Sequence, residues 1–302
     1  MPTIEIRPRG PFSLAAARDF AGGFPAGIGG GGVGEGSITL AFPVEGANES
    51  AAIELWQDPD GVVRGRSDAT GSLLAGALVQ VTRSLSLDHD GSGWPAVGDR
   101  DPFVGRLQRE HEYLRPVCFY SAYEAVTSFV IGQRISRRQS AVIKRDLAER
   151  LGDRPTIAGV PVPAFPRPTR LLELREARGL SDEKVRRLHG LAQAALDGRL
   201  DTEALRAMPE AAALAQLREL PGVGPFTADA VLYRGCGVVD GLPASDELGG
   251  TVIRDSYGLE TVRPADVQRI TDAWRPYRMW AVVLLRLGWT RTQGANVSYR
   301  RR

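Results

Sequence analysis

Hydrophobic and polar positions follow two different periods along the chain, and the change falls near residue 100. In the first part, apolar and polar side chains alternate with the period of two that is typical of β-strands. The segments with this alternation are residues 3–7, 37–44, 52–56 and 61–66. Two further segments, residues 13–20 and 72–85, have the spacing of short helices. We therefore expect an antiparallel sheet with helices on one face.

Beyond residue 100, apolar residues recur every three or four positions, which is the period of an amphipathic helix. The segments predicted to be helical are residues 103–113, 139–151, 171–178, 181–196, 210–220, 248–257 and 262–274. Residues 86–102 are rich in Gly, Asp and Pro and are expected to form a linker. The fold class is therefore predicted to be α+β and mostly helical. The expected parts are an N-terminal α+β domain with an antiparallel sheet (1–100), a helical region (101–290) and a flexible basic C-terminal tail (291–302).

The most informative stretch connects two predicted helices and reads Leu-Pro-Gly-Val-Gly-Pro-Phe-Thr-Ala-Asp at residues 220–229. Pro221 and Gly222 end the first helix, and Gly224 supplies a second flexible point. Pro225 begins the next helix, where its missing N–H costs nothing. The turn carries no bulky side chain, so a phosphate can approach the N–H groups at the start of the second helix.

A carboxylate follows this turn at a short distance. Asp246 lies 22 positions after Gly224 (246 − 224) and closely follows the Leu-Pro pair at 242–243. A carboxylate held beside an anion-binding turn favours chemistry on a nucleic acid. The alternative interpretation is that the turn only joins two helices.

Together, these residues resemble the helix-hairpin-helix DNA glycosylase superfamily, and their spacing is similar to that of the bacterial 3-methyladenine DNA glycosylase II branch. The resemblance implies a mostly helical fold in which a hairpin holds a DNA phosphate, with a monovalent cation as a candidate at the hairpin. It implies that Asp246 is the catalytic carboxylate. The residues assigned to DNA binding at and after the hairpin are Pro221, Gly222, Val223, Gly224 and Thr227.

Two more segments are similar to helices of this family, at residues 116–136 and 274–285. The first, with Val-Ile-Gly-Gln at residues 130–133, is similar to the family's Ile-x-Gly-Gln pattern, whose Gln and following residue fill the gap that a flipped base leaves. The resemblance assigns that role to Gln133 and Arg134. Arg134 departs from the apolar residue usual there, although a planar guanidinium can also stack in a base-sized gap. The alternative is a solvated helix end rich in Arg and Gln.

Cleavage of an N-glycosidic bond builds positive charge on the sugar, which a fixed carboxylate stabilises. The substrate implied by the resemblance is double-stranded DNA with a damaged base, expected to be alkylated. The aromatic candidates for holding that base are Phe226, Tyr120 and Tyr123, although aromatic residues in helices are more often part of the core.

Family members that also cut the strand carry a lysine two residues after the last hairpin Gly, where it forms a Schiff base with the sugar. This chain has Phe226 at that position, and its two lysines, Lys144 and Lys184, are far from the motif in sequence. We therefore expect a monofunctional glycosylase that acts in base excision repair and leaves an abasic site.

Composition adds few constraints. The formal net charge of the 302 residues is +2, which by itself demands no polyanionic partner. Cys118 and Cys236 are too few for a disulfide framework or for a four-cysteine iron–sulfur cluster. No metal or cofactor is expected beyond the candidate cation. No apolar run has membrane length, and we expect a cytoplasmic monomer. A non-catalytic DNA-binding module and a protein-interaction scaffold remain the alternative functions, and Asp246 favours the enzyme.

Overall fold

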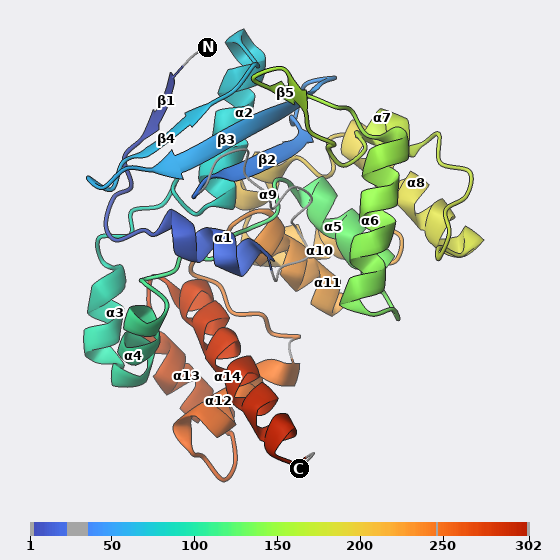
Figure 1. Cartoon of the computed structure of the whole chain (residues 1–302). Coiled ribbons are helices and arrows are strands. Elements are labelled where there is room, and N and C mark those ends of the chain that lie inside the picture. The colour runs from blue at the N-terminus through green and yellow to red at the C-terminus, as the bar shows by residue number, and fades with distance from the viewer. Residues whose placement is uncertain (1–2, 23–35, 246, 301–302) are drawn as a thin grey trace.

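The computed structural model describes residues 3–22, 36–245 and 247–300. The N-terminal part contains a four-stranded antiparallel sheet in the order β1-β4-β3-β2. The strands are β1 (Thr3–Ile6), β2 (Ile38–Pro43), β3 (Ser50–Gln57) and β4 (Val63–Arg66). Alternate residues of β2, Leu40 and Phe42, join the core that the sheet shares with α1 (Leu14–Gly22) and α2 (Gly71–Ser84). The predicted strands and helices of this part are therefore present (Figure 1).

The opposite face of the sheet is also covered, because β2 and β3 are buried along most of their length. Ala41 and Ala52 on this face pack with Ile157 and Ala164. Ile157 belongs to a short hairpin formed by β5 (Thr156–Ile157) and β6 (Val160–Pro161). The sequence predicted only helices against one face, because a two-residue strand gives no recognisable period.

The remaining described chain is mostly helical, which confirms the predicted α+β fold class. Its helices are α3 (Trp94–Arg100), α4 (Pro102–Glu110), α5 (Ala122–Gly132), α6 (Arg137–Leu151), α7 (Pro168–Leu171), α8 (Asp182–Leu196), α9 (Thr202–Ala207), α10 (Glu210–Arg218), α11 (Pro225–Ala230), the π-helix η1 (Val231–Gly235), α12 (Glu247–Tyr257), α13 (Pro264–Asp272) and α14 (Arg278–Arg300).

These helices pack around two separate cores. The first surrounds α5, which is buried on nearly all sides by α6, α8, α11 and η1. The second joins α3 and α4 to α12, α13 and α14, and these helices lie together below the sheet in Figure 1. Asp101 links distant segments of the second core, because one of its oxygens accepts from Trp274 Nε1 at 2.8 Å and from the Tyr257 hydroxyl at 2.5 Å.

Three predicted boundaries are wrong. The expected linker at 86–102 contains α3, because Trp94 is fully buried against Tyr277 and Trp280. The helix expected at 171–178 is only the single turn α7, since the carbonyl oxygen of Leu174 bonds the His189 ring instead of continuing a helix. The tail expected from residue 291 continues α14 to Arg300, because no proline interrupts it. No helix in the described ranges is long and apolar enough to cross a membrane.

Candidate DNA-binding and active site

The turn between α10 and α11 is built around one glycine that no other residue can replace without strain. Gly222 has φ +79°, and a Cβ there would come within 2.8 Å of the Arg187 side chain. Gly224 differs, because it is extended at φ −95° as the N-cap of α11. A Cβ at Gly224 would meet nothing within 4 Å. Pro221 is exposed and Val223 is buried, so the turn presents backbone to solvent beside the start of α11.

The end of α5 is bonded directly to this turn. Gln133 Nε2 donates to the carbonyl oxygen of Gly222 at 2.8 Å. Arg187 Nη1 donates to Gln133 Oε1 at 3.3 Å. Lys184 Nζ donates to the backbone carbonyl oxygens of Gln133 and Ile131, at 2.7 and 2.8 Å. The two predicted DNA-binding segments therefore lie side by side, and the Gln133 amide already has protein partners.

Arg134 follows in a left-handed conformation with φ +58°, which is uncommon for a residue other than glycine. Its side chain is exposed. Ser136 then begins α6 with a capping box that it forms with Gln139. The chain thus turns sharply between two helices, and Arg134 lies at the exposed point of that turn.

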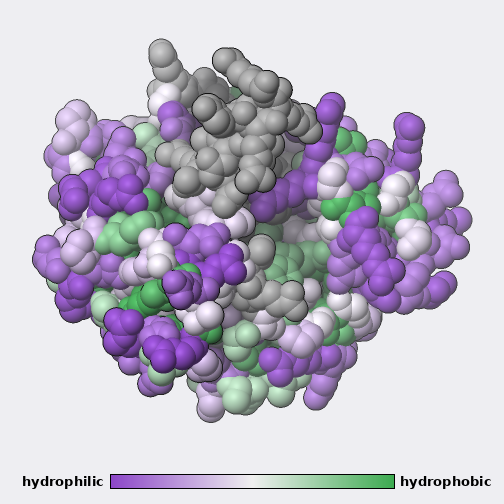
Figure 2. All heavy atoms as spheres, turned by 90° about the horizontal axis from the view of Figure 1, so that it is seen from below, coloured by the Kyte–Doolittle hydropathy of each residue, from purple (hydrophilic) through white to green (hydrophobic). Residues whose placement is uncertain are grey.

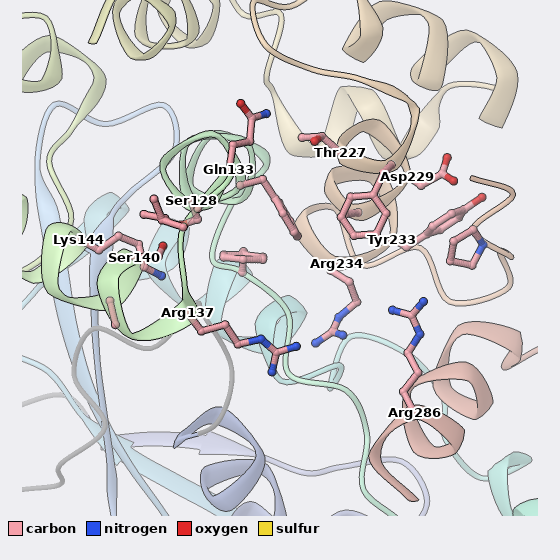
Figure 3. A pocket seen from close by; sticks show the side chains of 18 of the residues that line it. Ser128, Gln133, Arg137, Ser140, Lys144, Thr227, Asp229, Tyr233, Arg234 and Arg286 are labelled. Atoms are coloured by element: carbon pink, nitrogen blue, oxygen red, sulfur yellow. The ribbon is translucent and has the colours of Figure 1, made fainter. Parts of the chain in front are cut away.

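A cavity of about 610 Å³ lies beside these segments, between α5, α6, α11, η1 and α14 (Figure 3). Three phenylalanines line it: Phe119, Phe129 and Phe226. The ring of Phe129 meets that of Phe226 edge to face, with 6.2 Å between centroids. Phe226 is 51% exposed, so its ring lies at the opening. From below, the surface is hollowed between polar flanks, with apolar atoms inside the hollow (Figure 2).

One carboxylate in the cavity wall holds the segment that precedes the predicted catalytic acid. Asp229, which is 2% exposed, accepts from the backbone N and hydroxyl of Ser245 at 2.9 and 2.5 Å. Asp246 itself lies outside the described residues. Asp240 has a different role, because it binds Arg278 and Arg275 at 2.7 and 2.8 Å.

A buried lysine whose charge interacts with that of a buried glutamate forms another part of the site. Lys144 lines the cavity and is 2% exposed, and Glu124 is 3% exposed. Burial raises the pKa of Glu124 to about 7, while the charge of Lys144 opposes that rise. Burial also lowers the pKa of Lys144, and Glu124 partly offsets this. The two lysines are distant from the hairpin motif in sequence, but the expectation that they are also distant in the structure is wrong. Lys144 lines the same cavity as Phe226, and Lys184 donates to the backbone at the end of α5.

Two arginines add positive charge at the cavity wall. Burial lowers the pKa of both Arg234 and Arg286, and the charge of Arg234 lowers the pKa of Arg286 further. Figure 3 shows the guanidinium groups of Arg137, Arg234 and Arg286 pointing toward the same part of the cavity. These side chains come from α6, η1 and α14, so residues from distant parts of the sequence meet here.

Two predicted base-pocket residues are not at the cavity. Tyr120 is buried against Phe42 of the sheet, with ring centroids 4.4 Å apart. Tyr123 is buried in the helical core, and its hydroxyl donates to the carbonyl oxygen of Pro166 at 3.0 Å. Both are core residues, because each is buried and packs within a hydrophobic cluster rather than along the cavity. Phe226 and Thr227, in contrast, do line the cavity.

Sequence reasoning missed Ser128, Lys144, Asp229 and Arg286 as cavity residues. Asp229 ends the quoted hairpin motif and could have been found there. Arg286 follows Met279 by seven positions on one helix, which puts both on the same face, and both line the cavity. Lys144 gave no signal, because it lies within a polar helix. In the described part of the chain, no three His, Cys, Asp or Glu side chains cluster as metal ligands.

This combination of a sheet domain, a turn between two helices and an adjoining cavity gives a fold similar to those of solved DNA glycosylases. A 3-methyladenine DNA glycosylase from Archaeoglobus fulgidus matches with a TM-score of 0.76 and 20% identity, over 95% of this chain and 97% of that chain. The protein MBOgg1, solved with a low-affinity DNA ligand, matches with a TM-score of 0.72 and 16% identity, over 94% and 93%. The apo form of an 8-oxoguanine glycosylase/lyase from Clostridium acetobutylicum gives 0.66 and 15%, over 94% and 95%.

Sequence comparison covers much less of the chain. No family model matches it. A stretch of 66 residues is 44% identical to a probable bifunctional transcriptional activator/DNA repair enzyme AlkA from Mycobacterium tuberculosis. That stretch spans 22% of this chain and 13% of the relative. The structural matches, rather than the sequence matches, confirm the resemblance predicted from the sequence, at the level of the fold.

Proposed function

We propose that this protein is a DNA glycosylase that flips a damaged base out of double-stranded DNA and hydrolyses its N-glycosidic bond. The observation that carries the proposal is the contact between Asp229 and Ser245 in the wall of an aromatic cavity. It anchors Ser245, the residue before Asp246 in the sequence, next to a space that can hold a base, beside an exposed helix-hairpin-helix turn. A ligand cavity of a few hundred Å³ is in the usual range for such sites.

The turn at residues 221–224 would hold the DNA backbone. The first N–H groups of a helix have no intrahelical partner, so those at the start of α11 can donate to a phosphate. The carbonyl oxygens of Leu220 and Gly222 each accept one hydrogen bond and keep a second lone pair, so they also fit the monovalent cation that the resemblance implies. The exposed Arg134, at the sharp turn before α6, would enter the duplex where the base has left.

The cavity would receive the flipped base, since a base inside a duplex cannot be reached. The rings of Phe129 and Phe226 offer apolar faces and edges on which a base can stack. An alkylated base is the substrate class that the sequence resemblance implies, and it is kept here as a hypothesis.

Asp246 would stabilise the positive charge that develops on the deoxyribose and orient the attacking water. In the sequence it directly precedes Glu247, the first residue of α12. The free N–H groups at a helix N-terminus favour an ionised carboxylate. Because Phe226 stands where strand-cutting relatives carry lysine, the proposed product is an abasic site in an intact strand.

Release of free bases from damaged duplex DNA by the full chain tests the proposal. We expect base release by the wild-type protein and none by Asp246→Asn. A protein that binds DNA but releases no base from any lesion would instead be a non-catalytic helix-hairpin-helix DNA-binding protein.

A further inference from the structure

Three buried polar atoms in the cavity have no hydrogen-bond partner within the described part of the chain: Ser128 Oγ, Lys144 Nζ and Asp229 Oδ1. Their residues are 4%, 2% and 2% exposed. Buried polar atoms in folded proteins nearly always have partners, because leaving one unpaired is costly. Three such atoms in one cavity, on three different helices, indicate that a ligand with its own polar groups belongs there.

The arrangement of these atoms defines which ligand groups would fit. Figure 3 shows Ser128 and Lys144 on one side of the cavity and Asp229 on the other, with the aromatic rings between them. An ammonium group only donates hydrogen bonds, and a hydroxyl group can donate as well. The wall formed by α5 and α6 therefore fits an acceptor edge, such as a carbonyl oxygen with a neighbouring ring nitrogen.

The charges of the residues that line the cavity favour the same kind of ligand. Five of the described lining residues are cationic and one is acidic; the cations are Arg137, Arg138, Lys144, Arg234 and Arg286. A base that carries a positive charge is repelled by the buried Lys144 and the partly buried Arg234 and Arg286, because the lower dielectric of the interior strengthens the Coulomb interaction. A neutral base with carbonyl groups is not repelled.

We propose that Lys144 and Ser128 determine substrate specificity, and that the cavity prefers neutral carbonyl-bearing bases, such as deaminated or oxidised purines, over cationic alkylated ones. This inference rests on the proposed glycosylase function and departs from the alkylated substrate that the resemblance implies.

The chemistry of the leaving base supports the same preference. When the C1′–N bond breaks, its electron pair stays on the base nitrogen and water adds a hydroxyl group to C1′; water's proton ends on a neutral base, and is released to solvent when the base was cationic. A neutral base therefore gains negative charge in the transition state, which the cationic wall stabilises. A cationic base leaves as a neutral molecule, so the same wall gives it no such help.

The test uses single-turnover excision by the full chain on three duplexes of one sequence. They carry hypoxanthine, 8-oxoguanine or 3-methyladenine, and each rate is divided by the rate of spontaneous loss of that base. We expect an advantage of at least tenfold for one or both carbonyl-bearing bases over 3-methyladenine. A preference for 3-methyladenine would overturn the inference and leave the glycosylase proposal intact. No release from any duplex would overturn both.

Variants then assign the preference to residues. Lys144→Met combined with Glu124→Gln removes both charges of the buried pair, so that neither is left unpaired. Ser128→Ala removes only the hydroxyl group and tests the same wall if the double variant does not fold. Each folded variant is expected to lower the ratio of carbonyl-base to 3-methyladenine excision by tenfold or more. Arg145→Met is the matched control, because Arg145 is exposed on the same helix and does not line the cavity. An unchanged ratio in folded Lys144 and Ser128 variants would refute their assigned role.

Discussion

At the scale of single residues, the proposed reaction would depend on a carboxylate that stays ionised beside the sugar. Asp246→Asn keeps the size of the side chain and removes its charge. We expect base release to fall by roughly two or more orders of magnitude, because the charge on the sugar loses its counter-charge. DNA binding should stay intact or become tighter, since a negative charge near the backbone is removed. Single-turnover excision and fluorescence anisotropy measure the two effects.

Two neighbouring acids serve as controls for this assignment. Asp240→Asn should lower the excision rate less, because Asp240 forms ion pairs with Arg275 and Arg278. Its loss should affect packing more than the chemical step. Glu247→Gln should also cost less, since residue 247 lies about 100° round the helix from its neighbour. Normal excision by Asp246→Asn together with none by Glu247→Gln would move the catalytic role by one residue.

We expect an unbroken DNA strand after base release, and no covalent adduct on treatment with borohydride. The position of the Schiff-base lysine holds Phe226, and Lys144 lies in the wall where the base would bind, with its charge interacting with that of Glu124. Denaturing gels of the reaction products measure strand cleavage and adduct together. An adduct that disappears in Lys144→Met with Glu124→Gln would show that Lys144 reaches the sugar and that the enzyme is also a lyase.

The buried pair makes the stability of the fold depend on pH. Burial raises the pKa of Glu124 to about 7, above its ordinary value of 4.5, so between these values the folded protein binds more protons than the unfolded chain. The contribution of Glu124 is therefore fully present below pH 4.5 and is lost as pH rises through 7. Denaturant unfolding should show a larger loss of stability from pH 5 to pH 7 in the wild type than in Glu124→Gln.

Glu149→Gln is the control for this experiment, because Glu149 is exposed on α6 and should leave the pH dependence unchanged. Parallel stability curves for the wild type and Glu124→Gln would contradict the shifted pKa.

Sequence reasoning at the residue scale worked where a motif fixes the backbone. Gln133 and the hairpin do lie side by side, and Phe226 does line the cavity. It failed for Tyr120 and Tyr123, because the pattern of a helix that is buried on all sides does not show which face borders a cavity. It failed for Lys144 because contacts between α5 and α6 depend on packing that sequence distance does not show.

At the scale of elements, the two hairpin glycines give a matched pair of variants. Gly224→Ala adds a methyl group in open space at an extended residue, so the free energy of unfolding should change little. The same methyl group lies where a phosphate would approach, so affinity for duplex DNA should fall about tenfold or more. Gly222→Ala should lower stability as well, because φ is +79° and Arg187 is in the way.

Thermal unfolding and anisotropy on the same preparations separate the two outcomes. A Gly224→Ala protein that binds DNA as tightly as the wild type would exclude close contact between this turn and the phosphate backbone.

The regular elements could be predicted from their periods, and the irregular ones could not. The helix expected at 181–196 is α8, and the Ser181 side chain caps it by accepting from Lys184 N. The short α9 and the π-helix η1 were missed. Six residues carry too little pattern to recognise, and a π-turn depends on the packing of η1 against α5 rather than on any residue type.

At the scale of the whole molecule, binding to undamaged duplex DNA should be dominated by phosphate contacts. The net charge of +2 is small, but the arginines on the hairpin side and in the cavity wall concentrate positive charge on one region. We expect the affinity to fall steeply with salt, with a log–log slope of several units. Anisotropy titrations over a range of salt concentrations measure this slope. A flat response would contradict the nucleic-acid interpretation.

The core around Asp101 also sets the order in which the chain can fold. Its partner Trp274 lies 173 residues later in the sequence, so neither α3 nor α4 can complete its packing until nearly the whole chain exists. A ribosome that adds about 5–20 residues per second needs roughly 10–35 s to make the intervening segment. During that time the apolar faces of α3 and α4 are exposed, and closing so long a loop is slow. Helices α3 and α4 must therefore remain soluble without their packing partners until synthesis ends. We expect a chain truncated before residue 257 to aggregate.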